Sequence, residues 1–237
     1  TTDFSLIAVS DDGGNLALER VAVGEHILLG GDNMDLALGH GLEPQFAGEG
    51  QRLPAARFAQ LVQRCRLAKE QLLAANAPES VAVTLLGGGS QLLAQTRSAT
   101  LTRDAVRQAV VEGFLPPAQI TDQPARRQGA LRTLSLPYPA DAAISRHLAL
   151  FLAQHAAAEL PDTLLLNGGV FHAHALVQRL TEQLGEWRGA PLRVLHNPHP
   201  DWAVARGAAA HGLAEYESKR PPSLTGQAQA ASKTIVP

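Results

Sequence analysis

The sequence predicts an α/β protein, and two patterns at its ends predict that class. Residues 4–9 and 16–23 are apolar runs, and the stretch 10–15 between them is rich in turn-forming residues. This arrangement is typical of a β-hairpin. From residue 163 the pattern becomes strand, glycine turn, helix, strand, helix, which is typical of a parallel α/β unit.

The middle of the chain mixes helical and strand patterns, so we expect a split organisation. Residues 1–30 and 130–216 would form the α/β core of a lobe, and residues 31–129 would form an inserted α+β subdomain. The segment 217–237 is rich in Pro, Ser, Gln, Ala and Lys and lacks periodicity, which predicts a linker or a disordered tail.

The expected subdomain begins with helices. Apolar residues within 34–38 predict a short helix, which the Gly- and Pro-containing stretch 39–53 interrupts. A longer helix is expected over about 54–75, because apolar residues recur there every three or four positions. That stripe consists of Phe58, Leu61, Val62, Cys65, Ala68 and Leu72.

Strand patterns follow this helix. Residues 80–86 and 91–98 bracket the glycine-rich stretch 87–90, so we expect a second hairpin with its tip there. The segment 116–129 is rich in Pro, Gln and Arg and predicts a surface loop, and the helical period returns over 140–158.

Composition limits the classes of function. Of 237 residues, 45% are hydrophobic and 18% charged, which excludes a wholly disordered chain. Twenty basic and 22 acidic residues give a net charge of −2, so we expect neither a nucleic-acid partner nor attraction to an anionic membrane. No apolar run approaches the roughly 20 residues of a membrane span.

Cys65 is the single cysteine and therefore has no internal disulfide partner. A lone thiol in an amphipathic helical pattern favours a reducing, cytoplasmic setting. We interpret Cys65 as a packed apolar residue, because no pattern of the Cys-His-acid kind accompanies it.

Two glycine pairs carry the chemistry, in Gly30-Gly31-Asp32-Asn33-Met34-Asp35 and in Asn167-Gly168-Gly169-Val170. Glycine has no side chain and adopts positive φ readily, so backbone N–H groups beside it can approach a phosphate or a ribose closely. A single pair is usually only a turn. The order and spacing of the two pairs make them informative.

With the later phrase His199-Pro200-Asp201-Trp202-Ala203-Val204-Ala205, these motifs resemble the second lobe of the nucleotide-binding domain of DnaK-type chaperones, the seventy-kilodalton heat-shock class, in a divergent bacterial branch. The resemblance extends to about residue 214 through scattered short motifs. It implies an actin-like ATPase lobe, in which helices flank a ribonuclease-H-like sheet and an α+β subdomain is inserted. The matching positions are Gly30, Gly31, Asp32, Asp35, Gly168, Gly169, Pro200, Asp201, Ala203, Val204, Ala205, Gly207, Ala208 and Ala209.

The chain begins Thr1-Thr2-Asp3-Phe4-Ser5, without methionine and on a strand already under way, so we expect a piece of a longer protein. Thr1, Asp3 and Ser5 match the end of the family's phosphate loop. The resemblance therefore implies that Thr1 and Asp3 help to hold phosphate or hydrated Mg²⁺.

The same resemblance implies a set of nucleotide-binding residues, with ATP or ADP and Mg²⁺ as the cofactors of the full-length parent. Lys69, in the phrase Arg64-Cys65-Arg66-Leu67-Ala68-Lys69-Glu70, is the candidate ribose contact. The implied nucleotide-binding residues are Thr1, Asp3, Gly30, Gly31, Lys69, Gly168, Gly169 and Asp201.

The expected base pocket departs from the family. Relatives clamp adenine between two arginines, and Glu70 and His172 stand at those positions here. Leu73 and Val170 replace hydroxyl side chains near the base. A cation–π sandwich worth about 0.5–2 kcal/mol per face would be weakened or lost.

The resemblance implies the nucleotide-binding lobe of a chaperone-like ATPase, which is incomplete for catalysis without the missing first lobe of the same protein. No catalytic residue is assigned to this chain, and client polypeptides or co-chaperones are the other expected partners. Two alternatives stay open: a fragment of another actin-superfamily kinase, or a non-enzymatic interaction module that has lost nucleotide binding.

Two further patterns receive the simpler interpretation. The histidines at 172, 174, 196 and 199 lack the cysteine or acid that would complete a zinc site, so no metal site is predicted. The basic stretch 124–128 lacks interleaved aromatic residues and is interpreted as a solubilising part of a loop.

Overall fold

The computed structural model describes residues 1–48, 50–86, 96–125, 140–156 and 159–219. The chain divides into two compact units, Thr1–Pro200 and Asp201–Pro237, and each is described by itself. The expected hairpin tip at 87–90 and part of the basic stretch, Arg126 to Gln128, lie outside the described residues.

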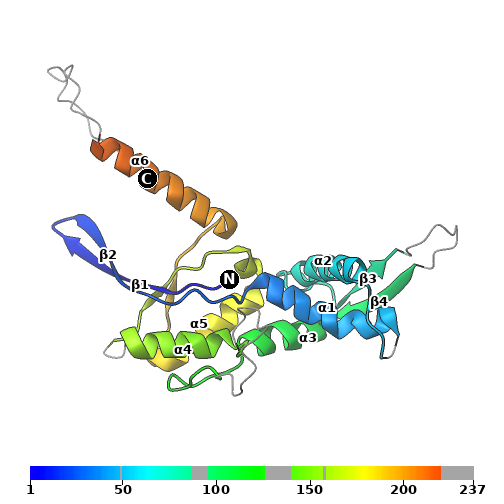
Figure 1. The fold of residues 1–237 in the computed structure, drawn as a ribbon. Helices are drawn as coiled ribbons and strands as arrows, with labels where there is room; N and C mark the ends of the chain where they lie inside the picture. Colours follow the sequence, from blue (N-terminus) through cyan, green and yellow to red (C-terminus); the bar gives the residue numbers. More distant parts are fainter. Residues whose placement is uncertain (49, 87–95, 126–139, 157–158, 220–237) are drawn as a thin grey trace, which may run out of the picture. The chain divides into compact units, whose positions relative to one another are not determined.

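The first unit is a mixed α/β structure (Figure 1). Its elements in chain order are β1 (Ser5–Asp12), β2 (Asn15–Val23), α1 (Gly31–Ala47), α2 (Ala55–Leu72), β3 (Ser80–Leu85), β4 (Arg97–Thr102), α3 (Arg103–Val106), the π-helix η1 (Arg107–Glu112), α4 (Ile144–His155), β5 (Thr163–Leu164), the 3₁₀ helix η2 (Gly169–His172), α5 (His174–Arg188) and β6 (Arg193–Val194).

The predicted amino-terminal hairpin is confirmed. β1 and β2 pair antiparallel from Ser5↔Val23 to Asp12↔Asn15, and Gly13 and Gly14 supply the two positive φ angles of the turn. At the open end of the hairpin, Thr2 and Ile27 exchange backbone hydrogen bonds of 2.8 and 3.0 Å. This pairing leads the chain directly to Gly30 and the start of α1.

The expected short helix is wrong in its length, because α1 continues through Gly39, Gly41 and Pro44 to Ala47. Packing against α2 accounts for the difference: a Cβ on Gly39 would lie 2.9 Å from Val62 Cγ2, so the glycine lets the two helices meet closely. The buried Glu43 accepts hydrogen bonds from Leu53 N–H and Arg52, which holds the segment after the helix. Tertiary contacts thus override weak helix propensity.

The predicted long helix is confirmed as α2, and its stripe buries Leu61, Cys65, Ala68 and Leu72.

β3 lies where the first strand of the second hairpin was expected, but its partner is β4 at Arg97–Thr102, later than the expected strand at 91–98. The later position puts Ala99 and Leu101 beside Val81 and Val83 on the face that packs under α1 and α2. The sheet therefore pairs its apolar residues, which fixes the register. Residues 91–95 lie outside the description.

The predicted loop after residue 115 has neither helix nor strand in its described part, 116–125. It is nevertheless anchored: Ala118 N–H donates to Gln183 Oε1, and Trp187 Nε1 donates to Ala118 O, both at 2.9 Å. The helix expected over 140–158 forms as α4 from Ile144 to His155, after a turn held by Asp141.

The predicted strand-turn-helix-strand order is confirmed: β5 and β6 pair in parallel, and α5 connects them. The described strands form three separate two-stranded sheets. The fold is therefore mixed α/β, while the actin-like lobe and its division into core and insertion stay predictions.

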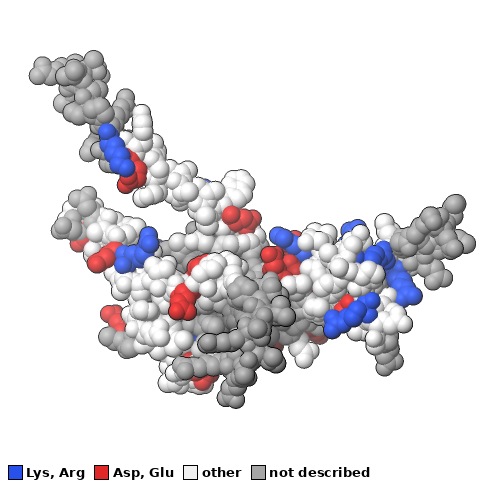
Figure 2. All heavy atoms as spheres, viewed as in Figure 1, with Lys and Arg blue, Asp and Glu red and all other residues white. Residues whose placement is uncertain are grey.

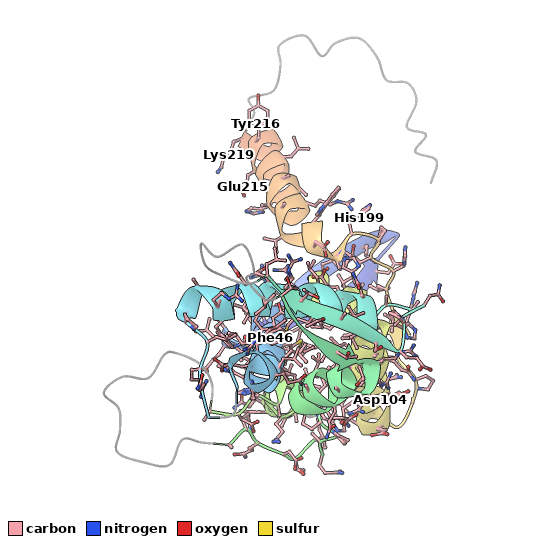
Figure 3. The ribbon with its side chains drawn as sticks, turned by 90° about the vertical axis from the view of Figure 1, so that its right-hand side faces the viewer. Phe46, Asp104, His199, Glu215, Tyr216 and Lys219 are labelled. Atoms are coloured by element: carbon pink, nitrogen blue, oxygen red, sulfur yellow. The ribbon has the colours of Figure 1, made fainter. Side chains whose placement is uncertain are left out.

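The second unit contains α6 (Ala203–Lys219), preceded by the 3₁₀ helix η3 (Pro200–Trp202), which begins at the last residue of the first unit. Figure 3 shows Glu215, Tyr216 and Lys219 along α6, where Lys219 Nζ lies 2.6 Å from Glu215 Oε2. The helix continues two residues beyond the expected start of the tail at 217, and residues 220–237 lie outside the description.

Candidate functional site

The first glycine pair stands at the amino terminus of α1. Gly30 precedes the helix in an extended conformation, and its N–H donates to Asn33 Oδ1 at 2.9 Å. The carbonyl of Gly30 accepts from the N–H groups of Asn33 and Met34. The N–H groups of Gly31 and Asp32 have no acceptor within the helix or among the other described residues, so they are available to an anion.

The amino-terminal residues lie against this glycine. A Cβ on Gly30 would lie 2.5 Å from the backbone nitrogen of Thr1, a separation that no real side chain allows. The approach is fixed by Thr2, whose hydroxyl donates to Leu29 O at 2.9 Å. Thr1 and Gly30, both predicted site residues, are therefore neighbours, and Figure 1 shows the amino terminus beside α1.

Lys69 reaches the same place from α2. Its Nζ lies 2.7 Å from Asp35 Oδ1 and 3.3 Å from the carbonyl oxygen of Gly31. Both side chains of the ion pair are buried, with 10% of Lys69 and 4% of Asp35 exposed. The contact is close but oblique, and Oδ1 accepts no hydrogen bond of ordinary direction from the described residues.

Burial and charge act in opposite directions on Asp35. Its pKa is raised above the ordinary value because burial disfavours the carboxylate, although the adjacent ammonium of Lys69 opposes that effect. Burial also raises the pKa of the Cys65 thiol to about 12, and the negative charge of Asp35 adds to this rise. Cys65 is a packed, protonated thiol, as the sequence predicted.

The second glycine pair, Gly168 and Gly169, comes from the carboxy-terminal part of the first unit. Gly168 adopts φ +102°, which L side chains rarely adopt, and its N–H donates to Pro200 O at 2.8 Å. Asn197 holds the same turn by donating to Asn167 Oδ1 at 2.8 Å. Two residues beyond Gly168, Val170 Cγ2 lies 3.2 Å from the position that a Cβ on Gly31 would occupy.

Three segments far apart in the sequence thus meet at Gly31. We call this group the glycine–lysine cluster and define it as Gly30, Gly31, Asp35, Lys69 and Val170. A Cβ on Gly31 would lie 3.6 Å from Lys69 Nζ as well as 3.2 Å from Val170. Any larger residue at position 31 would press on Val170, and the cluster combines free helix N–H groups with one buried cation.

The other predicted base-pocket residues differ in exposure. Glu70 is exposed and pairs with Arg66 at 3.2 Å within α2. His172 is exposed at the end of η2, two residues after Val170. Leu73 is buried in the apolar core, so its side chain packs rather than facing a solvent-filled pocket.

The predicted nucleotide-binding residues that are not members of the cluster are Thr1, Asp3, Gly168, Gly169 and Asp201. Asp3 is exposed, and its Oδ1 lies 2.7 Å from His26 Nδ1. Asp201 belongs to the second unit, which is described by itself. Gly169 begins η2 directly after the positive-φ turn, so it shapes the approach to Val170.

Asp35 is the member of the cluster that the predicted set omitted. It matched a position of the glycine-rich phrase, but its role as the counter-ion of Lys69 depends on the packing of α1 against α2. The sequence did contain a signal for this ion pair, because a lysine on the apolar side of a helix needs a buried anion as its partner.

Within the described ranges, no group of three or more His, Cys, Asp or Glu side chains is arranged to hold a metal ion. In the same ranges, no helix is both long enough and apolar enough to span a bilayer. Neither the models of known protein families nor the curated proteins give a match to this chain.

Proposed function

We propose that the chain is the nucleotide-binding lobe of a chaperone-like ATPase, and that ATP or ADP binds at the glycine–lysine cluster. The observation that supports this proposal is the meeting of three separately predicted segments. Val170 Cγ2 and Lys69 Nζ lie 3.2 and 3.6 Å from the position that a Cβ on Gly31 would occupy, although the three residues come from separate parts of the sequence.

The cluster has the chemistry to hold a phosphate or a ribose. The amino terminus of a 17-residue helix offers the N–H groups of Gly31 and Asp32, and the helix dipole favours an anion there. An ammonium has three N–H donors, and in Lys69 one donates to the Gly31 carbonyl while a second lies beside Asp35. The remaining donor would serve a ribose hydroxyl or a phosphate oxygen.

Hydrolysis is proposed to require the first lobe of the parent protein. Phosphoryl transfer depends on positioning and on neutralisation of charge, with Mg²⁺ bridging phosphate oxygens. In this proposal Thr1 and Asp3 contribute to the phosphate or the hydrated metal, and the other groups come from the first lobe. The unpaired, buried thiol of Cys65 suits the cytoplasm, where such a protein would work.

Calorimetric titration of the chain with ADP in the presence of Mg²⁺ tests the proposal. The wild-type chain should bind ADP, and Gly31→Val should weaken binding at least about tenfold, or 1.4 kcal/mol, because the new side chain fills the approach to Lys69. Gly41→Val is the matched control, since a Cβ on Gly41 in the same helix meets nothing within 4 Å. Equal affinity of the two variants would remove the cluster from the site.

One observation favours the alternative of an interaction module without nucleotide. Lys69 already has a close anionic partner in Asp35, in a buried position, so the pair also fits a purely structural role. The same titration separates the two: absence of binding of both ADP and ATP by the correctly folded wild-type chain would support the interaction module.

A further inference from the structure

A groove runs along α2 and the edge of β3. It consists of two adjoining hollows of about 270 and 730 Å³ that share part of their lining. The residues common to both are Arg64 and Leu67 from α2, and Thr84 and Leu86 from the end of β3 and the residue after it.

The groove follows the edge of the strand rather than one of its faces. Val81, Ala82, Val83 and Thr84 are consecutive, and all four line it, although neighbouring residues in a strand point to opposite faces. β3 is paired with β4 alone, and among the described residues no other backbone segment bonds to it. Every second residue of this edge therefore directs an unpaired N–H and C=O outward.

Two leucine side chains in the lining of the groove are exposed. Leu67 on α2 is 50% exposed, and Leu86 beyond the strand is 67% exposed. Both line the groove and offer apolar contacts to an alternate side chain of an added strand.

The charge of the groove is positive. Arg57 and Arg64 line it, and no acidic side chain is among the described residues of its lining. Arg57 donates to the Leu86 carbonyl, while Arg64 has no hydrogen bond or ion pair among the described residues. Figure 2 shows Lys and Arg side chains over the part of the first unit that contains α2, β3 and β4.

We propose that this groove binds an extended acidic polypeptide segment, which adds to β3 as a further strand. The backbone of the segment bonds to the free edge, an aliphatic side chain contacts Leu67 and Leu86, and a carboxylate pairs with Arg64. An unpaired strand edge is specific for another polypeptide backbone, and the part of the lining that the structure describes has no aromatic residue on which a nucleic-acid base could stack. The site is independent of nucleotide binding.

The first test is selection of a displayed library of random nonapeptides on the whole 237-residue chain. We expect enrichment of peptides that alternate aliphatic with other residues and carry Asp or Glu. The most enriched peptide, synthesised with a fluorescent label, should bind at least about tenfold more weakly to Arg64→Glu and to Leu67→Ser. Both positions are exposed, and Arg20→Glu in the exposed hairpin is the matched charge control that should bind normally.

The second test leaves the protein unchanged. The same peptide with alternate backbone nitrogens methylated keeps its side chains but cannot pair along one edge, so its binding should be lost. Equal binding of the methylated peptide, no enrichment, or enrichment without acidic residues would each overturn the proposal. So would a dimer in sedimentation velocity that Leu67→Ser abolishes, because a second copy of the chain would then be the occupant.

Discussion

Lys69 of α2 and Asp35 of α1 form a buried ion pair, with Nζ 2.7 Å from Oδ1. The pair joins the two helices beside Gly31, whose carbonyl oxygen accepts a hydrogen bond from Lys69. The stability of the helix packing and the shape of the candidate site therefore depend on the same two side chains. Charges removed from water at this depth are costly unless they are compensated, and each partner therefore depends on the other.

Removing one member of this pair should cost more than removing both. Lys69→Met leaves a buried carboxylate uncompensated and should lower the free energy of unfolding by about 3–5 kcal/mol, whereas Lys69→Met with Asp35→Asn should cost less. Urea unfolding measures both. Arg66→Ala, which breaks an exposed pair in the same helix, is the control and should cost under about 1 kcal/mol. Additive costs in the double variant would show that the two charges are not coupled.

The Cys65 thiol should be inert in the folded chain. Its pKa of about 12 leaves almost no thiolate at pH 8, and the side chain is fully buried. Ellman's reagent should react with Cys65 only as fast as the chain opens, and with an ordinary thiol rate in urea. Rapid reaction under native conditions would contradict the packed position of this residue.

The second glycine turn should tolerate substitution at one position only. Gly168 has φ +102° and ψ +146°, a region close to glycine-only, so Gly168→Ala should cost about 1–3 kcal/mol of folding stability. Gly169→Ala, at a neighbouring glycine without a positive φ, should cost less than half as much. Thermal unfolding of the two variants in parallel measures the difference, and equal losses would count against strain at residue 168.

Local patterns predicted the parts of the fold whose stability is local or periodic. The stripe of α2 and the hairpin of β1 and β2 follow from spacing and turn residues, and both formed as expected. α1 was not predictable in length, because Gly39 and Pro44 weaken a helix by themselves and only the contact with Val62 explains the continuation. The partner of β3 was misplaced for a related reason: burial of Ala99 and Leu101 decides the register, and the glycine stretch does not.

The candidate site, too, could be predicted only where its signal lies in the local sequence. The resemblance indicated Gly30, Gly31, Lys69 and the segment of Gly168, and the structure brings parts of all three segments together. Asp35 was missed as a partner because the pair exists only through the crossing of two helices. Leu73 was expected near a base, yet the apolar core buries it at the end of α2.

Asp141 should make the stability of the first unit depend on acid pH. Burial alone would raise its pKa, but the N–H groups of Ala125 and Ala143, at 2.8 and 2.9 Å, and the charge of Arg146 outweigh burial and hold the pKa below its ordinary value. A depressed folded pKa adds stability that is complete above the ordinary pKa, about 4, and is lost as pH falls through the folded value.

Asp141→Asn should therefore cost about 1.5–3 kcal/mol at pH 7 and progressively less below pH 4. Urea unfolding at a series of pH values measures this convergence. The exposed Asp162→Asn should change neither the stability nor its pH dependence. A difference between wild type and Asp141→Asn that stays constant down to pH 2 would exclude a titrating role for this carboxylate.

Restoring the two arginines of the resembled family should strengthen adenine binding, if ADP binds at the glycine–lysine cluster. Glu70 follows Lys69 in α2, and His172 follows Val170 by two residues, so both exposed residues are near members of the cluster in the sequence. Glu70→Arg with His172→Arg would supply two planar guanidinium faces, each worth about 0.5–2 kcal/mol. Loss of the exposed Arg66–Glu70 pair should cost little stability.

The control is Glu70→Lys with His172→Lys, which adds the same formal charge without planar faces and should gain only the salt-dependent part of the affinity. Calorimetry with ADP at low and high salt separates the two effects. Equal gains in the arginine and lysine variants would show that charge alone acts, and that adenine does not lie between these two positions.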